Sequence, residues 1–437
     1  GSNNVAVGRS ALQDNTTGHS NVAVGYNAAI SVTTGTENVA VGMAALDNSD
    51  VGSFNTAIGK SALGNDTKGS RNTAVGNSAL QTQNFTSATD SYNTAMGFSA
   101  GTAVTTGVSN TLIGGLAGDA ITTGTYNVAL GRSALSANTT ASYNVAIGGD
   151  ALPANTTGAS NTAVGTNALL ANTTGANNVS VGKGALQSNT TASNNAAVGL
   201  EALRENTTGA NNSALGLYSL LSNTTGHSTI AVGTSAGYAV TTGTHNVLLG
   251  LEAGYGGTTI SRLTTGGSNT LVGAICHATA AAANYVNGFG YNLDCEAGYT
   301  TIGQAAEDIR AVHGTATWAA VSDQRYKKDI ADSTTGLNFI NALQPRTFNY
   351  KTLGELPETF RAYEADSTKV YKSSQTQHGF IAQEIKAAID ADDSIADGFK
   401  LWDDREDGSQ EVAEAALIPV LVKAIQELTA RLETLEG

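Results

Sequence analysis

The stretch Asn161-Thr-Ala-Val-Gly165-Thr-Asn-Ala-Leu169-Leu-Ala-Asn-Thr-Thr-Gly175-Ala-Asn177 decides the fold, because close variants of it recur along most of the chain. The last glycine of its Asn-x-Ala-Val-Gly block returns every 17 residues from position 8 to position 76, and again from position 97 to position 250. A constant interval of this length is typical of repeat architectures in which each unit stacks on the next.

One repeat contains the parts of a short coil. Thr162-Ala-Val164 predicts a minimal strand with β-branched residues on one face and a small alanine on the other. Gly165 permits a crowded turn, Ala168-Leu169 supplies a second short apolar step, and Asn172-Thr-Thr-Gly175 has the residues of a tight turn. We therefore expect two short strands and two turns per coil, with asparagine amides that bond to one another between coils.

The repeats predict a stacked shaft, because one unit cannot bury its apolar face alone. The repeated block resembles the Asn-x-Val-Ala-Ile-Gly repeats of trimeric autotransporter adhesin heads, which form interlocked trimeric β-rolls, although those repeats are a few residues shorter. The expected fold is therefore mainly β, a trimeric parallel β-solenoid or β-roll shaft of 17-residue repeats over residues 1–273.

Three places depart from the period. The step from Gly76 to Gly97 is 21 residues, because residues 83–92 add four residues and two aromatic side chains, and residues 256–267 add six more. Either insertion is a structural decoration or a ligand contact, since insertions in solenoids lie in loops on one face. After Gly273 the intervals shorten to 15, at Gly288 and Gly303, and we expect residues 274–321 to form an irregular shaft end and junction.

The charge of the chain argues against several partners. The formal net charge is −14, so neither a nucleic acid nor an anionic membrane surface is expected to bind. Charged residues make up only 13% of the chain, compared with about 25% in typical soluble domains. The sequence contains no run of about 18 apolar residues, so we expect no membrane insertion. Gly1-Ser2 resembles an expression remnant, and we expect the natural protein to continue before the first repeat.

Cysteines and asparagines suggest structural roles. Cys276 and Cys295 are the only cysteines, they form no CxxC motif, and we expect neither a metal site nor a cofactor. Whether the two cysteines pair in a disulfide is left open by their spacing. The Asn-x-Thr sequons, as at Asn155, Asn172 and Asn206, are interpreted as turn residues rather than glycan acceptors.

A second domain begins at Ser322, where the composition changes. Residues 322–437 hold 13 Lys and Arg and 21 Asp and Glu, whereas the 321 residues before them hold only 9 and 15. Charged residues are therefore much denser in residues 322–437 than in the shaft. Such a density is typical of the surface of an ordinary folded domain. We therefore expect an α+β domain over residues 322–437.

The junction Ser322-Asp323-Gln-Arg325-Tyr-Lys327-Lys328-Asp329-Ile330 resembles the Ser-Asp-x-Arg-x-Lys-x-x-Ile signature of the intramolecular chaperone domains of phage tail spikes and fibres, the peptidase S74 family. Further stretches resemble the same family in the expected order. They are Leu343-Gln-Pro345-Arg-Thr-Phe-Asn-Tyr350, His378-Gly-Phe-Ile-Ala-Gln383-Glu384-Ile385, and the terminal helix Ala416–Leu428.

The resemblance implies autoproteolysis by a serine and a lysine. Transferred by position, Ser322 is the nucleophile and Lys327 the base, with Asp323, Arg325 and His378 in support. A lysine acts as a base only as a neutral amine, which burial or a nearby cation favours, and Arg325 or the following lysine could supply that cation. His378 fits a structural hydrogen-bond donor equally well.

The scissile bond has two candidates. The family pattern implies Ser322-Asp323, whereas an N-to-O acyl shift would break Val321-Ser322. Either cut separates the shaft from the following domain.

The C-terminal residues predict a coiled coil over about 411–437. Apolar residues recur there at alternating spacings of 3 and 4, which is the seam of a period of 3.5. The seam residues are Ile418, Leu421, Ile425, Leu428, Leu432 and Leu435. The family resemblance implies three strands, and the alternative is a single helix packed on its own domain.

These features predict a structural and host-recognition fibre of a bacteriophage tail. Its C-terminal domain would drive trimerisation and folding and then be released. We expect a homotrimer in the virion, assembled in the host cytoplasm, with a host-surface glycan or protein receptor as partner.

Two other functions are weighed against the fibre. A polysaccharide-degrading spike needs paired carboxylates, and the acids of the repeats, such as Asp119, Asp150 and Glu201, form no recurring pair. A bacterial trimeric surface adhesin fits the repeats, but it does not explain the self-cleavage signature.

Overall fold

The computed structural model describes residues 1–256, 262–305, 307–315, 318–320, 322–360, 362–395, 399–404 and 408–436. It divides the chain into two compact units, Gly1–Val321 and Ser322–Gly437. We call the first unit the shaft and the second the C-terminal unit.

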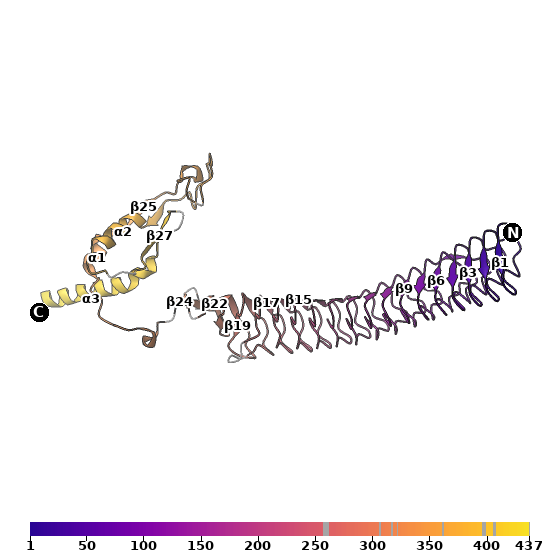
Figure 1. Ribbon diagram of the computed structural model, residues 1–437. Coiled ribbons are helices and arrows are strands. Elements are labelled where there is room, and N and C mark those ends of the chain that lie inside the picture. The colour runs from indigo at the N-terminus through magenta and orange to yellow at the C-terminus, as the bar shows by residue number, and fades with distance from the viewer. Residues whose placement is uncertain are drawn as a thin grey trace. The chain divides into compact units, whose positions relative to one another are not determined.

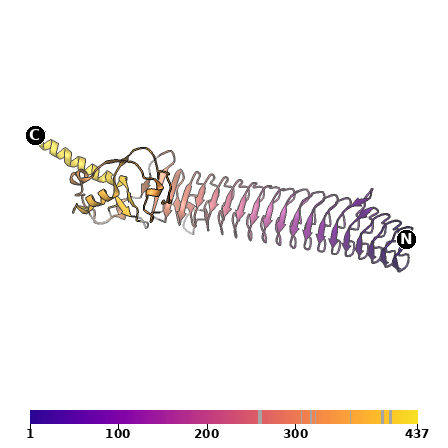
Figure 2. The same cartoon turned by 90° about the horizontal axis from the view of Figure 1, so that it is seen from above.

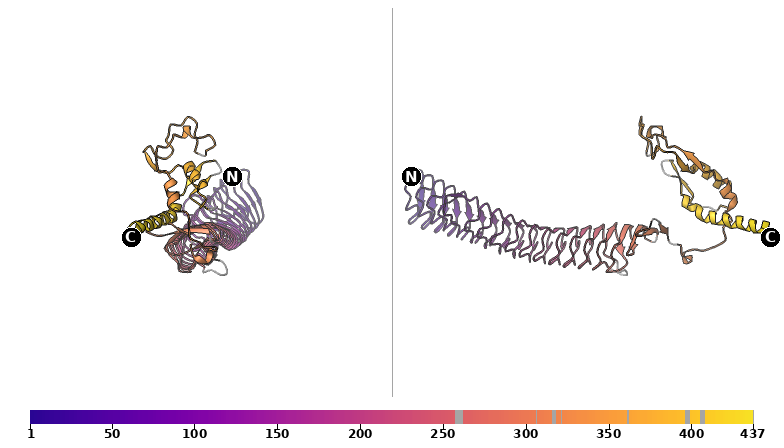
Figure 3. Two further views of the ribbon diagram at one scale, coloured as in Figure 1. Left: turned by 90° about the vertical axis from the view of Figure 1, so that its left-hand side faces the viewer. Right: turned by 180° about the vertical axis from the view of Figure 1, so that it is seen from behind.

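The shaft is a stack of coils, and each regular coil contributes one three-residue strand to a single parallel sheet (Figures 1 and 2). The strands are β1 (Val5–Val7), β2 (Val22–Val24), β3 (Val39–Val41), β4 (Thr56–Ile58), β6 (Thr73–Val75), β8 (Thr94–Met96), β9 (Thr111–Ile113), β10 (Val128–Leu130), β11 (Val145–Ile147), β12 (Thr162–Val164), β13 (Val179–Val181), β14 (Ala196–Val198), β15 (Ser213–Leu215), β16 (Ile230–Val232), β17 (Val247–Leu249) and β18 (Thr270–Val272). Figure 3 shows the stack from its end and from behind.

The register of this sheet follows the sequence period. Ala146 pairs with Ala163, and Ala163 pairs in turn with Ser180. The middle residue of each strand points inward, and Ala163 is fully buried, whereas its two neighbours in the strand are partly exposed. The mainly β, parallel solenoid of 17-residue repeats is therefore confirmed.

The second strand expected in each coil is absent from the regular coils. Ala168 and Leu169 are fully buried, as an apolar step should be, but they lie in a turn. Asn167 and Leu169 have φ angles of 59° and 52°, both in the left-handed region. Left-handed backbone at alternate positions bends the chain too sharply for a strand. Burial of the leucine side chain offsets the conformational cost of about 1–2 kcal/mol.

Asparagine side chains connect the coils, as predicted, but most of their hydrogen bonds are to main-chain groups rather than to one another. The Oδ1 atom of Asn161 accepts the backbone N–H of Asn178 at 3.0 Å, and its Nδ2 atom donates to the carbonyl of Gly175 at 2.8 Å. The same arrangement repeats at the asparagine before most strands, and we call it the first asparagine ladder. It fixes the register of each coil on the next.

A second asparagine ladder lies in the tight turns. Asn172 donates from Nδ2 to Oδ1 of Asn155 at 2.9 Å and to the carbonyl of Gly175 at 3.0 Å. These sequon asparagines, Asn206 included, are fully buried. The interpretation of the sequons as turn residues agrees with this burial.

The predicted interval of 15 residues at the shaft end is wrong. Val272 pairs with Phe289 in β20 (Asn287–Tyr291), so the period of 17 holds for one more coil. Gly290 then pairs with Gly303 in β22 (Tyr299–Gln304), an interval of 13. Gly288 occupies the inward position of its strand instead. The last strands, β23 (Glu307–Val312) and β24 (Ala319–Ala320), are antiparallel.

The two cysteines meet inside the shaft end. Their Sγ atoms are 3.9 Å apart, and both side chains are buried free thiols. Gly288 makes room for them, because a Cβ atom there would lie 2.7 Å from Sγ of Cys276. Nearby, β19 (His277–Ala278) pairs in parallel with β21 (Asp294–Cys295).

In its described residues, the C-terminal unit combines three α-helices with two small antiparallel sheets. One sheet pairs β25 (Arg346–Phe348) with β26 (Gln377–Gly379), and the other pairs β27 (Trp402–Asp404) with β28 (Gln410–Val412). The helices are α1 (Leu337–Ala342), α2 (Ala382–Asp390) and α3 (Leu417–Glu436). The buried residues of the core are Phe339, Ile385, Leu401, Leu417 and Val420.

The predicted coiled-coil segment is only partly helical. Strand β28 and a 3-10 turn at Glu414–Ala416 precede the helix, which begins at Leu417, and Gly437 lies outside the described residues. Pro419 fits the first turn of α3, where it removes no helical hydrogen bond. No helix in the described part of the chain is both long and apolar enough to cross a membrane.

Helix α3 has two apolar faces. Leu417, Val420 and Ala424 are buried against its own unit. The predicted seam adjoins this buried face and is exposed, with exposed fractions of 61% at Ile425 and 46% at Leu428. The helix therefore packs on its own domain and still presents an unpartnered seam.

The first asparagine ladder predicts a specific loss of stability. Asn161→Ala leaves the buried N–H of Asn178 without a partner, and we expect the free energy of unfolding to fall by about 1–3 kcal/mol. Denaturant unfolding measures this difference. Thr174→Ala is the control, because Thr174 is exposed in the same coil, and its effect should stay within about 0.5 kcal/mol. Equal losses in both variants would contradict the role given to the ladder.

Candidate active site

Ser322 and Lys327 are brought together by a short turn. The 3-10 turn Gln324–Tyr326 reverses the chain, and Nζ of Lys327 donates a hydrogen bond to Oγ of Ser322 at 2.7 Å. The backbone N–H of Lys327 donates to the carbonyl of Gln324 at 2.9 Å, which closes the turn. A spacing of five residues is therefore sufficient to place the amine on the hydroxyl.

Asp323 holds this turn. Its Oδ1 atom accepts the backbone N–H of Arg325 at 2.8 Å and so caps the turn at its start. The same carboxylate also binds the guanidinium of Arg325, with Nη2 to Oδ2 at 2.6 Å. This ion pair lowers the pKa of Asp323 and raises the pKa of Arg325.

The expected cation beside the lysine is differently placed. The guanidinium of Arg325 forms an ion pair with the carboxylate of Asp323, the residue that caps the turn. Ser322, Lys327 and Lys328 are all exposed in the single chain.

The two candidate scissile bonds lie on either side of Ser322. Val321 lies outside the described residues, so the geometry of the Val321-Ser322 bond is not compared with that of Ser322-Asp323. The choice between the two bonds stays a prediction.

His378 lies in a separate part of the C-terminal unit. It is exposed on β26, opposite Thr347 of β25. It lines a pocket of about 690 Å³ together with Phe348, Tyr350 and Glu414. No hydrogen bond or ion pair within the described residues joins His378 to Ser322 or Lys327, so the supporting role predicted for it is not visible in the single chain.

Sequence reasoning missed the residues that build this pocket and its support. The rings of Phe348 and Tyr350 pack edge to face with their centroids 5.4 Å apart. Tyr350 packs on Tyr371 in the same way, with centroids 5.9 Å apart. Arg346 of β25 binds Glu384 of α2, with Nη2 to Oε1 at 2.7 Å. The signal was present, because all of these residues except Tyr371 lie in the two motif stretches at 343–350 and 378–385.

A further contact missed by sequence reasoning ties the first helix to the last. The carboxylate of Glu427 in α3 accepts the backbone N–H of Leu337 at 2.9 Å, at the start of α1. An anion is favoured at this end of a helix because the free N–H groups there carry partial positive charge. The pairing joins residues 90 positions apart, so no local pattern could have revealed it.

No cluster of three or more His, Cys, Asp or Glu side chains suited to a metal ion occurs among the residues with a described placement. The site is therefore described by its serine, its lysine and the turn between them.

Residues 322–393 match a protein-family model, Peptidase_S74, described as chaperone of endosialidase. The match starts at Ser322, where the C-terminal unit also starts. It covers the junction signature and both internal motifs, and it ends before the stretch Ala416–Leu428. A search of curated proteins gave no match to the chain.

A parallel β-solenoid followed by a domain that matches this family model defines the class of protein to which the chain is similar. Within that class, the C-terminal unit of this chain contains a chaperone domain of the Peptidase_S74 family. That family is autoproteolytic, which agrees with the serine and lysine at the start of the match.

Proposed function

We propose that the chain is a structural and host-recognition fibre of a bacteriophage tail. Its C-terminal unit drives trimerisation and folding and is then released by self-cleavage at about Ser322. The observation that carries this proposal is the 2.7 Å hydrogen bond between Lys327 and Ser322, located at the first residue of the chaperone-family match.

The chemistry requires the lysine in its neutral form. A neutral amine on Lys327 accepts the proton of the Ser322 hydroxyl as its Oγ attacks a neighbouring carbonyl carbon. The peptide C–N bond then breaks, the leaving amine takes up a proton, and water hydrolyses the resulting ester. Each chain carries out this reaction once.

Assembly offers a way to control the reaction. Ser322 and Lys327 are exposed in the single chain, where water stabilises a charged ammonium group. Packing against neighbouring copies would bury the amine and favour the neutral form. Cleavage would then follow correct association of the chains.

Two unpartnered apolar surfaces support a homotrimer. The outward face of the shaft sheet carries a row of apolar side chains, with exposed fractions of 43% at Leu130, 37% at Val198 and 51% at Leu215. The seam of α3 is exposed in the same way, as at Ile425. Copies of the same chain could cover both surfaces, since both repeat along an axis.

A removable chaperone suits this shaft. Coils of nearly identical sequence can pair in the wrong register, because each coil fits several neighbours equally well. A C-terminal unit that brings three chains together first would set one register. Removing it afterwards would leave the shaft kinetically trapped. The fibre would be assembled in the host cytoplasm and function in the virion.

A polysaccharide-degrading spike has less support. Glu201 binds Arg204 at 2.8 Å and Asp150 binds Arg132 at 3.0 Å, so both carboxylates are in ion pairs. Burial raises the pKa of Asp119, but this residue lies in a different coil from either. A trimeric surface adhesin would leave the Ser322 site without a role.

The serine and lysine predict the outcome of a denaturing gel. The wild-type chain of 44.2 kDa should appear as fragments of about 32 and about 12 kDa. Ser322→Ala removes the nucleophile and Lys327→Ala removes the base, so each variant should remain full length. Lys369→Ala is the control, because Lys369 is an exposed lysine of the C-terminal unit outside the turn, and this variant should be cleaved normally. An uncleaved wild-type chain would refute self-cleavage.

Asp323 predicts a smaller effect on the same reaction. Asp323→Ala removes the cap of the turn, and loss of such a cap costs about 0.5–2 kcal/mol, which corresponds to a slowing of roughly 2- to 30-fold. A time course of fragment appearance measures the rate. Complete loss of cleavage in this variant would instead indicate that the carboxylate takes part in the chemistry.

The helical seam predicts the number of associated chains. In a Ser322→Ala background, which stays uncleaved, the chain should sediment as a trimer. Ile425→Glu puts a charge into the seam and should reduce the trimer strongly. Gln426→Glu adds the same charge one position off the seam and should leave the trimer intact. A monomeric Ser322→Ala chain would contradict the proposed assembly.

A further inference from the structure

A single column of side chains runs along the shaft at the residue just before the first asparagine ladder. All of its members have left-handed backbone, with φ between 50° and 64°. Asparagine and serine hold most positions, as at Asn177 and Ser160, and short polar residues tolerate this conformation best. The column therefore has a preferred residue type set by the backbone.

Four aromatic residues depart from this preference within neighbouring coils. They are Phe54, Tyr92, Tyr126 and Tyr143, with exposed fractions of 44%, 55%, 53% and 61%. Bulky residues are disfavoured in left-handed backbone. Most leucines at other left-handed positions, such as Leu169, offset this cost by complete burial. The exposed aromatic residues gain no such burial, so folding does not explain them.

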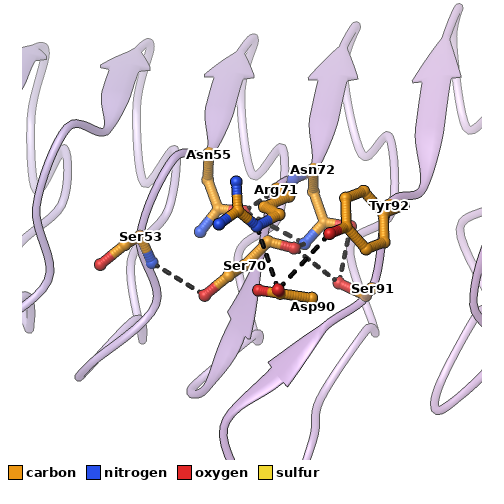
Figure 4. A network of polar contacts seen from close by, with 8 residues as sticks. All are labelled: Ser53, Asn55, Ser70, Arg71, Asn72, Asp90, Ser91 and Tyr92. Carbon is orange, nitrogen blue, oxygen red and sulfur yellow. Dashed lines mark hydrogen bonds and ion pairs between the residues drawn. The ribbon is translucent and has the colours of Figure 1, made fainter.

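The insertion at residues 83–92 adds polar groups to these rings. Its strand β7 (Thr89–Asp90) pairs with β5 (Gly69–Ser70), which places Asp90 beside Arg71. Nε of Arg71 lies 3.1 Å from Oδ2 of Asp90, and both side chains are about half exposed. Figure 4 shows these two side chains together with Tyr92 next to the buried asparagines.

Arg71 belongs to the column itself and lies between two of its aromatic residues. Its guanidinium carbon is 4.7 Å from the ring centroid of Phe54 and 5.9 Å from that of Tyr92. One coil beyond Tyr92 the column holds Ser109, so the ring of Tyr92 has no aromatic neighbour in that coil. The rings of Tyr126 and Tyr143 then stack at 5.3 Å, with planes 4° apart.

We propose that Phe54, Arg71, Tyr92, Tyr126 and Tyr143 form a binding site for a polysaccharide chain. The apolar C–H faces of sugar rings pack on aromatic rings, and sugar hydroxyls bind to guanidinium, carboxylate and phenol groups. The column and the adjoining Asp90 supply both kinds of group. Coils repeat at about 4.8 Å, so the site is itself a periodic line suited to a periodic polymer.

The chemistry favours a polysaccharide over a protein partner. A protein interface of standard size buries about 800 Å² per partner around a broad apolar centre. The column is one residue wide and has polar neighbours in most coils. Because Asp90 balances the charge of Arg71, a neutral or weakly acidic polymer fits better than a strongly acidic one.

This inference deepens the host-recognition part of the proposed function and rests on it. The test applies the trimeric Ser322→Ala chain, which stays full length, to an array of purified bacterial capsular and O-antigen polysaccharides. Tyr126→Asn with Tyr143→Asn restores the residue type preferred by the column. We expect at least a 10-fold loss of polysaccharide binding, with a melting temperature that is unchanged or higher.

Tyr285→Asn is the matched control, because Tyr285 is an exposed tyrosine of the same column far from the cluster. It should leave binding unchanged. Binding that survives in the double variant, or a wild-type chain that binds no polysaccharide, would overturn the site. A double variant that no longer sediments as a trimer would also overturn it, by assigning the column to contacts between copies. Self-cleavage is read on a separate gel, so failure of the site and failure of the proposed function are distinguishable.

Discussion

The shaft depends on the buried asparagine amide. In each regular coil one asparagine accepts the main-chain N–H of the next coil and donates to a glycine carbonyl, as Asn161 does with Asn178 and Gly175. Buried main-chain groups need such partners. The same hydrogen bond joins the coils on either side of each insertion. Oδ1 of Asn72 accepts the backbone N–H of Asn93 at 3.1 Å, and Oδ1 of Asn246 accepts that of Asn269 at 3.1 Å. At residues 83–92 the extra residues must therefore leave the stack, which is how Asp90 comes to lie beside Arg71.

The same close stacking determines which residues the coil can hold. At Gly148 a Cβ atom would lie 2.8 Å from the carbonyl oxygen of Gly165 in the next coil, and the φ angle of 132° already disfavours other residues. The core is correspondingly thin, with fully buried alanine and leucine in each turn. Stability comes from the repetition of one small set of contacts. Because the coils are nearly identical, several chains could align with one another in more than one register, and the proposed chaperone unit would select one of them.

The C-terminal unit differs in kind, because its contacts are not repeated. Glu427 binds the start of α1 across 90 residues, and Arg346 binds Glu384 across 38. Its helix α3 uses one face for its own core and leaves the seam open. The proposed catalytic pair, in contrast, is held by a local turn capped by Asp323. Exposure of this pair in the single chain is consistent with a reaction that waits for assembly.

The sequence by itself determined the period, the inward alanines, the boundary region near Ser322 and the family of the following domain, because each is carried by residues close together in the chain. Only the tertiary structure decided the rest. Leu169 adopts left-handed backbone because burial outweighs its local preference, and Gly288 faces inward because two thiols occupy the space beside it. His378 lies on β26 opposite Thr347 because strand pairing places it there. Asp90 meets Arg71 because the register of β5 and β7 aligns two different coils. Such contacts depend on which coil or strand lies alongside, and that information is absent from any single repeat.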